Sequence, residues 1–370
     1  MHDKLHIVCL DAPAPPDYGG AIDMFYKVKA LAESGRRIEL HYFDYRPGRN
    51  CKGLESYCTA IHSYPRKSFG YSLRQKQPYI VGSRNAPALL ERLMADDAPV
   101  LLEGIHCTGL LSHLGEGRKV LVRMHNDEAA YYAGLAASER NFFRKSYYAL
   151  ESRMLHHFQQ HLPKSLPLAC VAHNDIETLR TRYGFVNLPF IPSFTPWQEL
   201  SGESGRGAFC LYHGNMEVSE NVQAAAWLLR NVFDGLDIPL VIAGKNIPES
   251  LAAGTGNANV RFVSSPDEAT MNALVREAQV HLLPSFNTTG LKLKMLHALF
   301  EGRHCLTNKA GIAGTAFDGA VELAEDAAGF REALLRLWEQ PFTVELRERR
   351  RIVADVYNNR KNAAALNAWL

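Results

Sequence analysis

Short apolar runs alternate with stretches of helical periodicity along the first half of the chain. Length and apolar composition indicate buried β-strands at residues 5–10, 37–43, 99–103, 119–124 and 168–172. Helical spacing over residues 21–34 fills the gap between the first two, and Gly35 ends that helix. This alternation predicts a parallel sheet with crossover helices, in which ligands bind beyond the carboxyl ends of the strands.

A second series of the same kind follows a segment with the composition of a linker. Residues 189–196 contain three prolines, and residues 201–207 are rich in Gly and Ser. Helices are then indicated at residues 221–233 and 268–278, and strands at residues 208–213, 239–243, 260–263, 280–284, 304–307 and 320–323. We therefore expect two Rossmann-like α/β domains that face each other across a cleft. The first domain would span 1–196, joined by a C-terminal helix at 355–370, and the second 197–354.

Composition narrows the functional class. A chain of 370 residues is longer than a domain with a single hydrophobic core usually is, which indicates two domains. Its net charge of +2 is too small to favour binding to nucleic acid. The seven cysteines form no CxxC pair and several lie in apolar runs. We expect them to be small buried residues in a reducing compartment, with no structural zinc site. No signal peptide and no apolar stretch of ~18 residues is found, which predicts a cytoplasmic protein.

Residues 36–92 are basic and aromatic. They contain eleven Lys or Arg against four Asp or Glu, interleaved with aromatic side chains. This pattern is compatible with contact to an anionic lipid surface, to a lipid-linked diphosphate or to a nucleic acid. Of these we expect peripheral contact with the inner face of a membrane and no nucleic acid partner. The alternative is a solvated, loop-rich edge of the first domain.

The stretch 280–302 predicts a strand, a tight loop and a helix over 291–300 that ends at Gly302. Thr288 and Thr289 can cap this helix, and Gly290 allows a ligand to approach the backbone. Lys292 and Lys294 fall in its first turn, where the helix dipole disfavours cations. An anion opposite them, such as a diphosphate, would explain both lysines. The alternative is that they are solvated residues of an ordinary surface helix.

Further candidate site residues follow two strands of the first series. His125, Asn126, Asp127 and Glu128 come directly after the strand at 119–124, where ligands of a parallel sheet bind. The helix expected at 129–155 carries aromatic residues that indicate core or interdomain packing.

A second pair of candidates follows the first strand. A proline-rich loop there ends at Gly19 and Gly20, either a ligand-binding turn or a plain tight turn. Elsewhere, Asp175 is expected to cap a helix at 176–183.

In order and spacing, these motifs resemble the GT-B-fold glycosyltransferases, specifically the large retaining group numbered family four. The resemblance covers nearly the whole chain. It rests on the glycine pair at 19–20, on RMHNDEAAYY at 123–132, on YHGNM at 212–216 with Asn221, on IAGKN at 242–246, and on GLKLKMLHA at 290–298 with Gly302.

The resemblance implies a nucleotide-diphospho-sugar held mainly by the second domain. Gly214, Asn215, Gly290 and Leu291 would face the diphosphate, with Gly19 and Gly20 closing over it from the first domain. The implied phosphate-neutralising and catalytic residues are Lys245, Lys292, Lys294 and His125, the last beside the donor sugar. Asn126, Asp127 and Glu128 would lie on the acceptor or sugar side. The acceptor would be a glycan or a lipid-linked glycan of surface polysaccharide or lipopolysaccharide synthesis.

The implied chemistry proceeds with retention and requires no metal cofactor. Breaking the sugar–phosphate bond builds negative charge on the diphosphate, which cations and helix N–H groups stabilise. The departing phosphate oxygen would take the proton of the acceptor hydroxyl, so no protein base is named. Asp96 and Asp97 are interpreted as solvated residues and not as a metal motif.

The sequence departs from the family pattern at the second domain. The paired glutamates of the family fall on Thr289 and His297, of which His297 can still hydrogen-bond a ribose hydroxyl. The Arg and Lys pair expected after the first strand is replaced by Asn215 and Met216. Two alternatives therefore stay open: a nucleotide-sugar epimerase of the same fold, and a non-catalytic GT-B-like partner subunit. The charged segment at 347–351 is interpreted as a solvated helix.

Overall fold

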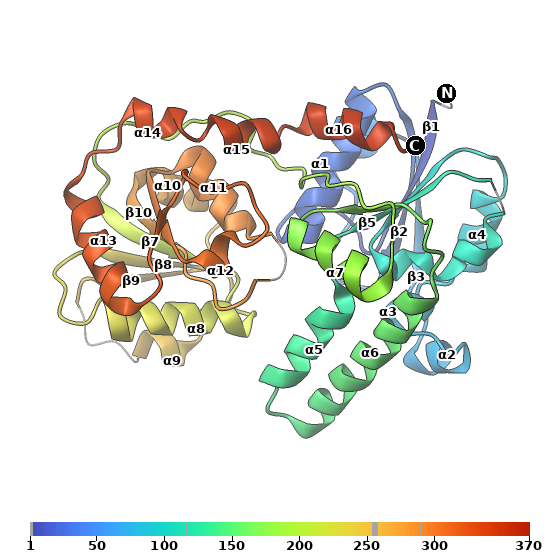
Figure 1. Ribbon diagram of the computed structural model, residues 1–370, viewed down its shortest axis with the longest axis horizontal. Coiled ribbons are helices and arrows are strands. Elements are labelled where there is room, and N and C mark those ends of the chain that lie inside the picture. Colours follow the sequence, from blue (N-terminus) through green and yellow to red (C-terminus); the bar gives the residue numbers. More distant parts are fainter. Residues whose placement is uncertain (1–2, 116, 254–257, 289–290) are drawn as a thin grey trace. The chain divides into compact units, whose positions relative to one another are not determined.

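The structure is a computed structural model that describes residues 3–115, 117–253, 258–288 and 291–370 (Figure 1). The chain divides into two compact units. The first comprises Met1–Pro196 and Tyr357–Leu370, and the second comprises Trp197–Thr288 and Lys292–Val356. Each unit is described by itself below.

The first unit is built on a six-stranded sheet in the order β3-β2-β1-β4-β5-β6, and every neighbouring pair is parallel. Its strands are β1 Lys4–Cys9, β2 Arg37–Asp44, β3 Cys58–Pro65, β4 Val100–Glu103, β5 Val120–Met124 and β6 Leu168–Cys170. Its helices are α1 Gly19–Glu33, η1 Glu55–Tyr57, α2 Phe69–Arg74, α3 Tyr79–Gly82, α4 Pro87–Leu93, η2 Ile105–His113, α5 Glu128–Ser138, α6 Phe142–His161, α7 His173–Tyr183 and α16 Asn359–Asn367.

Helix α16 closes the first unit from the far end of the sequence by packing beside α1 (Figure 1). The guanidinium of Arg36 donates to the side-chain oxygen of Asn367 at 2.8 Å. Ala363 and Leu366 of α16 join the same buried cluster as Val28 and Leu31 of α1. The last turn of the chain therefore contributes to the hydrophobic core of the first unit.

The second unit repeats the architecture with a parallel six-stranded sheet in the order β12-β11-β10-β7-β8-β9. Its strands are β7 Phe209–His213, β8 Leu240–Gly244, β9 Val260–Ser264, β10 Ala278–Leu282, β11 His304–Thr307 and β12 Glu322–Leu323. Its helices are α8 Ser219–Trp227, η3 Leu228–Val232, α9 Glu249–Ala253, α10 Glu268–Glu277, α11 Leu293–Glu301, α12 Lys309–Ile312, α13 Ala327–Glu339, α14 Val344–Glu348 and α15 Arg351–Val356.

The predicted fold class is confirmed by these two Rossmann-like parallel sheets with their helices. The central strands are almost wholly buried, as their continuous apolar sequences predict. The expected cysteine environment is also confirmed, because all seven are free and all but the half-buried Cys58 are buried. Among the described residues, no helix combines the length and the apolarity that a bilayer crossing requires.

One strand was missed, and several helix boundaries were predicted wrongly. Strand β3, which was not predicted from the sequence, lies within the basic stretch 36–92, pairs with β2 along its length and forms the edge of the sheet. The helix expected at 129–155 is two helices, α5 and α6, which lie side by side (Figure 1). The helix expected at 221–233 is α8 followed by the π-helical turn η3.

Two helices begin elsewhere than the capping arguments predicted. Asp175 is not the N-cap of α7, since Ala172 takes that position and Asp175 lies in the first turn. Helix α11 begins at Leu293 with Lys292 as its N-cap, so Thr288 does not cap it. Gly302 ends α11, as predicted.

The exposure of several side chains also differs from the prediction. Phe142 and Phe143, at the start of α6, are 74% and 82% exposed and do not pack in a core. Arg350, expected on a solvated helix, is 2% exposed. Its guanidinium donates to the carbonyl oxygens of Leu299 and Gly302 at 2.8 and 2.9 Å, which satisfies carbonyl groups at the end of α11.

Gly244, at the carboxyl end of β8, allows two loops of the second unit to meet. Its φ is +156°, and a Cβ placed on it would lie 1.8 Å from the carbonyl oxygen of Gly214. Such a contact involves backbone on both sides, so a side chain there would push the loop after β7 away from β8.

We expect Gly244→Ala to lower the free energy of unfolding by at least ~2 kcal/mol, because no side-chain rotation relieves the clash. Thermal unfolding measures the effect. Gly134→Ala is the matched control, since Gly134 lies within α5 with no atom near the position of the new Cβ. The control should be neutral or stabilising by ~0.5–1 kcal/mol. Equal melting temperatures for both variants would contradict the close-approach argument.

Candidate active site

A buried cluster of charged residues lies at the carboxyl ends of the central strands of the first unit. His125 follows β5, and Glu103 is the last residue of β4. Asp23 and Lys27 lie one turn apart on α1, and Arg123 comes from β5 itself. All are at most 1% exposed except His125, whose side chain is 12% exposed. His125 is thus the member of the cluster that solvent reaches.

Lys27 holds the two carboxylates together. Its ammonium lies 2.6 Å from Asp23 and 2.9 Å from Glu103. His125 Nε2 lies 3.0 Å from Oε2 of Glu103, an oxygen that Lys27 also contacts at 2.9 Å, while Nδ1 is 3.7 Å from Asp23. Because a carboxylate accepts, Nε2 of His125 carries the hydrogen and donates. Glu103 therefore fixes the orientation of the ring.

Arg123 connects this cluster to the chain that leaves β6. Its guanidinium donates to Asp23 at 3.0 Å and to the carbonyl oxygen of Pro192 at 3.0 Å, and also bonds the carbonyl oxygen of Ile191. The backbone N–H of Phe194 donates to Asp23 at 2.8 Å. Asp23 is thereby bonded from three elements, as an ion without water must be.

The pKa directions in the cluster follow from these contacts. Burial opposes ionisation of Asp23, but Arg123, Lys27 and His125 outweigh it and hold the pKa of Asp23 well below its usual value. Burial likewise opposes ionisation of Glu103, and Lys27 and His125 lower the pKa of that carboxyl. Both groups are therefore carboxylates at neutral pH.

Asp23, Glu103 and His125 each offer a metal-ligating atom, all within 4.8 Å of one another. The ammonium of Lys27 already lies in hydrogen-bond contact with both carboxylates. A divalent ion would have to displace this buried cation, whose charge the two carboxylates require. The donor set therefore fits a resident lysine better than a metal.

The residues after His125 have separate roles in the structure. Asp127 is the N-cap of α5 and accepts from the N–H groups of Ala129 and Ala130 at 3.1 and 3.3 Å. Glu128 is buried, which raises its pKa to about 7 against the opposing effect of a hydrogen bond from Asn126. An acceptor-side role for Asn126, Asp127 and Glu128 stays a prediction.

Gly19 and Gly20 form the first turn of α1 and do not end a loop as predicted. The N-cap is Tyr18, whose side chain makes no capping hydrogen bond. Backbone N–H groups of the first turn are thus left without a side-chain acceptor, which suits an anion. Lys27 and Asp23 lie farther along the same helix.

In the second unit, Lys294 is partly buried beside the end of β7 and the first turn of α8. Its ammonium lies 2.9 Å from the side-chain oxygen of Asn221 and 3.3 Å from the hydroxyl of Tyr212. Asn221 in turn donates to the carbonyl oxygen of Asn215 at 2.8 Å. Burial and the neighbouring Lys292 lower the pKa of Lys294 to about 8.

The other predicted phosphate-binding lysines differ in their surroundings. Lys292, the N-cap of α11, donates to the side-chain oxygen of Asn287 at 2.6 Å. Lys245 is about half exposed and forms an ion pair with Glu217 at 3.7 Å. The structure thus brings Lys292 and Lys294 together, whereas Lys245 is held by a carboxylate on another loop.

His297, the predicted ribose contact, is 6% exposed. Its ring stacks on Trp197 at 4.6 Å, and Nε2 lies 3.5 Å from Glu301.

Leu291, predicted to face the diphosphate, lies two residues before α11. Gly290 and Thr289 fall outside the described residues. Gly214 follows β7, next to Asn215.

Asp96 was predicted to be solvated, and the structure corrects this. It forms ion pairs with Lys4 at 2.6 Å and with Arg118 at 3.4 Å. It also lines a pocket of ≈ 520 Å³ with Met94 and Lys119. This pocket lies at the amino ends of β4 and β5, so it is separate from the candidate site around His125.

Sequence reasoning missed Asp23, Lys27 and Glu103 as site residues. Asp23 and Lys27 are spaced i, i+4 among the apolar residues of α1, which marks a charged pair on a buried face. Glu103 ends an apolar strand, the same signal that singled out His125. What the sequence could not give is that these three converge.

Comparisons with known proteins agree with the fold. No protein-family model matches the chain. An uncharacterised 44.6 kDa protein in the cps region of Klebsiella pneumoniae is 24% identical over 331 residues, which are 84% of each chain.

Three solved structures show the similarity in detail. Sucrose-phosphate synthase from Thermosynechococcus elongatus gives a TM-score of 0.69 at 13% identity, covering 99% of this chain and 97% of that one. TarM of S. aureus, in a complex containing UDP, gives 0.66 at 9% identity over 100% of both chains. The lipopolysaccharide outer core galactosyltransferase WaaB gives 0.62 at 11% identity, covering 98% and 99%. The GT-B fold predicted from the motifs is thereby confirmed.

We expect Lys27→Met to lower the free energy of unfolding by ~3–5 kcal/mol, because it leaves two buried carboxylates without their cation. The midpoint of urea denaturation measures the effect. Lys29→Met is the matched control, on the same helix but half-buried and packed on aromatic rings. It should cost less than ~1 kcal/mol. A Lys27 variant as stable as the Lys29 variant would show that Asp23 and Glu103 do not depend on this ion.

Proposed function

We propose that this GT-B-fold chain is a glycosyltransferase that moves a sugar from a nucleotide-diphospho-sugar to a glycan or lipid-linked acceptor. The observation that carries the proposal is His125, held by Glu103 at the carboxyl end of β5 in a chain of this fold. It occupies the place where ligands of parallel sheets bind. Retention of anomeric configuration and a role in surface polysaccharide synthesis are part of the same proposal.

The compared proteins support this class of substrate. The TarM complex contains UDP together with α-GlcNAc-glycerol. WaaB is a lipopolysaccharide outer core galactosyltransferase, and the K. pneumoniae relative comes from a cps region. A nucleotide-sugar donor and a glycan acceptor are therefore the partners we infer for this chain.

Leaving-group stabilisation would come from the start of α11. The first N–H groups of that helix lack a side-chain cap, and Lys292 and Lys294 bring positive charge to the same end. Negative charge that develops on the departing diphosphate is stabilised most strongly by such preorganised donors in a site of low dielectric. In this mechanism these groups require no metal ion as a partner.

Lys294 suits this role because its charge is destabilised before the donor binds. Burial and Lys292 lower its pKa to about 8, so a diphosphate would restore the charged form. Part of the binding energy then comes from restoring the charge of a partly desolvated cation. Lys245 is about half exposed and would contribute to phosphate binding only after its ion pair with Glu217 breaks.

His125 would position the sugar. Nε2 is engaged by Glu103, and Nδ1, 3.7 Å from Asp23, is beyond hydrogen-bond distance and can meet a sugar hydroxyl. The acceptor hydroxyl would attack from the face that the diphosphate leaves. The departing phosphate oxygen would accept its proton, so the reaction balances without a protein base.

We expect His125→Ala to reduce turnover by ~100-fold, because the sugar loses a fixed contact near the reacting carbon. Stability should fall by less than ~2 kcal/mol, since Lys27 still neutralises Glu103 and only one hydrogen bond is lost. Release of nucleotide from a panel of nucleotide-sugars measures turnover, and thermal unfolding measures stability. A folded variant with wild-type turnover would remove His125 from the site. Epimer formation without an acceptor would instead identify an epimerase.

We expect one of UDP, GDP, ADP, CMP or dTDP to raise the melting temperature without magnesium, by an amount equal to ~2.7 kcal/mol at 100 times its Kd. Lys292→Ala combined with Lys294→Met should weaken that binding at least ~10-fold. Lys309→Ala, an exposed lysine of the same unit, is the control. A double variant that binds as tightly as the control would place the phosphates elsewhere, and no shift with any nucleotide would favour a non-catalytic partner subunit.

The pH dependence of the same binding has a definite sign. Between pH 8 and about 10, the free protein has lost the Lys294 proton that the unfolded chain retains, and a bound diphosphate recovers it. Nucleotide binding should therefore take up a proton and weaken as pH rises through this window. Calorimetry in buffers of different ionisation enthalpy measures the uptake, which Lys294→Met should abolish.

A further inference from the structure

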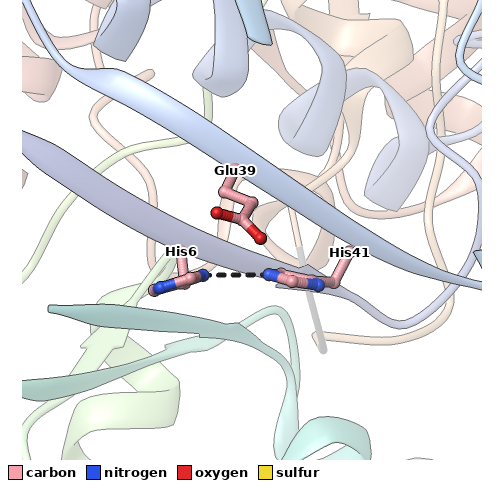
Figure 2. Close-up of side chains that lie close together, drawn as sticks. All are labelled: His6, Glu39 and His41. Atoms are coloured by element: carbon pink, nitrogen blue, oxygen red, sulfur yellow. Dashed lines mark hydrogen bonds between the residues drawn. The ribbon is translucent and has the colours of Figure 1, made fainter. Parts of the chain in front are cut away.

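We propose that His6, Glu39 and His41 form a binding site for a single divalent ion of the zinc type. The three side chains lie on neighbouring strands of the first sheet and point toward one another (Figure 2). Each offers one ligand atom, and these atoms lie within 4.8 Å of one another. The site is independent of the proposed sugar transfer, because His125 lies beyond the opposite ends of these strands.

Strand geometry explains the convergence. Glu39 and His41 are two residues apart on β2 and therefore project from the same face of the sheet. His6 is the register partner of Glu39 on β1. Nδ1 of His6 and Nε2 of His41 are 3.0 Å apart, joined by the hydrogen bond drawn in Figure 2. This spacing is close to that of two ligand atoms around one tetrahedral zinc ion, whose Zn–N distance is about 2.0–2.1 Å.

Each of the three ligands has its own supporting partner. Nε2 of His6 lies 3.0 Å from Asp96, and Nδ1 of His41 lies 2.9 Å from the hydroxyl of Tyr64. The Glu39 carboxylate accepts from His62 at 3.0 Å. Such outer contacts orient metal ligands in proteins and fix the tautomer of a ligating histidine.

The protonation states suit a metal. His6 and His41 are both 0% exposed and meet ring nitrogen to ring nitrogen at 3.0 Å, a contact in which one ring must accept through the free lone pair of a neutral imidazole. Because Asp96 accepts from Nε2 of His6, the lone pair of Nδ1 faces His41. Metal binding would require the hydrogen of His41 to lie on Nδ1 instead of Nε2. Nδ1 would then donate a hydrogen bond to the hydroxyl oxygen of Tyr64. The proton count of the two rings is unchanged by this exchange of tautomers.

Lys4 acts as a built-in competitor. Its ammonium lies 2.7 Å from Glu39 and 2.6 Å from Asp96, and its side chain is 30% exposed. An incoming dication would repel this charge, and Lys4 can move into water. The ligand set of two imidazoles and one carboxylate suits zinc, with water in the fourth position. Access is available from the side of Asp96, which lines the ≈ 520 Å³ pocket and is 28% exposed.

Two other groups of side chains could bind the added metal, so the experiment must distinguish them from the proposed site. His157 and His161 lie one turn apart on α6 with ring centroids 4.2 Å apart, so they could bind zinc at the surface. The cluster around His125 holds Lys27 between its carboxylates. The test therefore uses a full-length background variant with His157→Gln and His161→Gln, freed of metal by a chelator.

The experiment is a titration of this background with Co²⁺, followed by displacement with Zn²⁺. We expect one ion per chain, the visible absorption of four-coordinate Co²⁺, and a rise in melting temperature. Asp96→Asn should weaken binding ~10–100-fold, and Glu39→Gln should weaken it more. His113→Gln, at an exposed histidine of the same unit, should change nothing.

Lys4→Gln gives a result of opposite sign and tests the proposal even if Glu39→Gln fails to fold. This variant removes the competing cation, so it should bind the ion more tightly while the metal-free protein becomes less stable. The proposal is overturned by absence of four-coordinate Co²⁺ in the background, by Glu39→Gln binding as tightly as the background, or by weaker binding in Lys4→Gln. None of these readouts depends on sugar transfer.

Discussion

The first unit depends on one buried ammonium. Lys27 lies between the carboxylates of Asp23 and Glu103, which join helix α1 to the end of strand β4. Taking these ions out of water costs several kcal/mol each, so the cluster is stable only while every charge is matched. Arg123 completes the match and connects the chain that leaves β6. The position of His125 follows from this network, because Glu103 is both a partner of Lys27 and the acceptor for the ring.

The second unit positions its candidate phosphate-binding groups by backbone contacts instead. Gly244 lets the loop after β8 meet the carbonyl of Gly214, and Asn221 bonds the loop after β7. At the other end of α11, buried Arg350 satisfies the carbonyl groups of the last turn. Helix α11 is therefore held near its start by the contact of Lys294 with Asn221 and at its end by Arg350.

Both functional proposals use the same sheet at different places. The carboxyl ends of β4 and β5 present Glu103 and His125, where a ligand of this fold would bind. Nearer the amino ends of β1 and β2, His6 and His41 form a hydrogen-bonded chain in the interior. At both places the side chains are linked to one another by hydrogen bonds and ion pairs. The two proposals thus use separate places on one sheet, one for group transfer and the other for holding an ion.

The sequence by itself determined the class of fold and where most strands lie. Apolar runs of strand length are local signals, and they placed eleven of the twelve strands that the described residues form. Strand β3 was missed because its alternating polar residues lack such a run. It also singled out His125, which directly follows a buried strand. Tertiary structure alone decided that Lys27 meets Glu103, 76 positions away, that His6 meets His41, and that Arg350 is buried. The partners in these contacts are far apart in the sequence, and no local pattern indicates which residues will meet. The order and register of the strands decide which residues become neighbours.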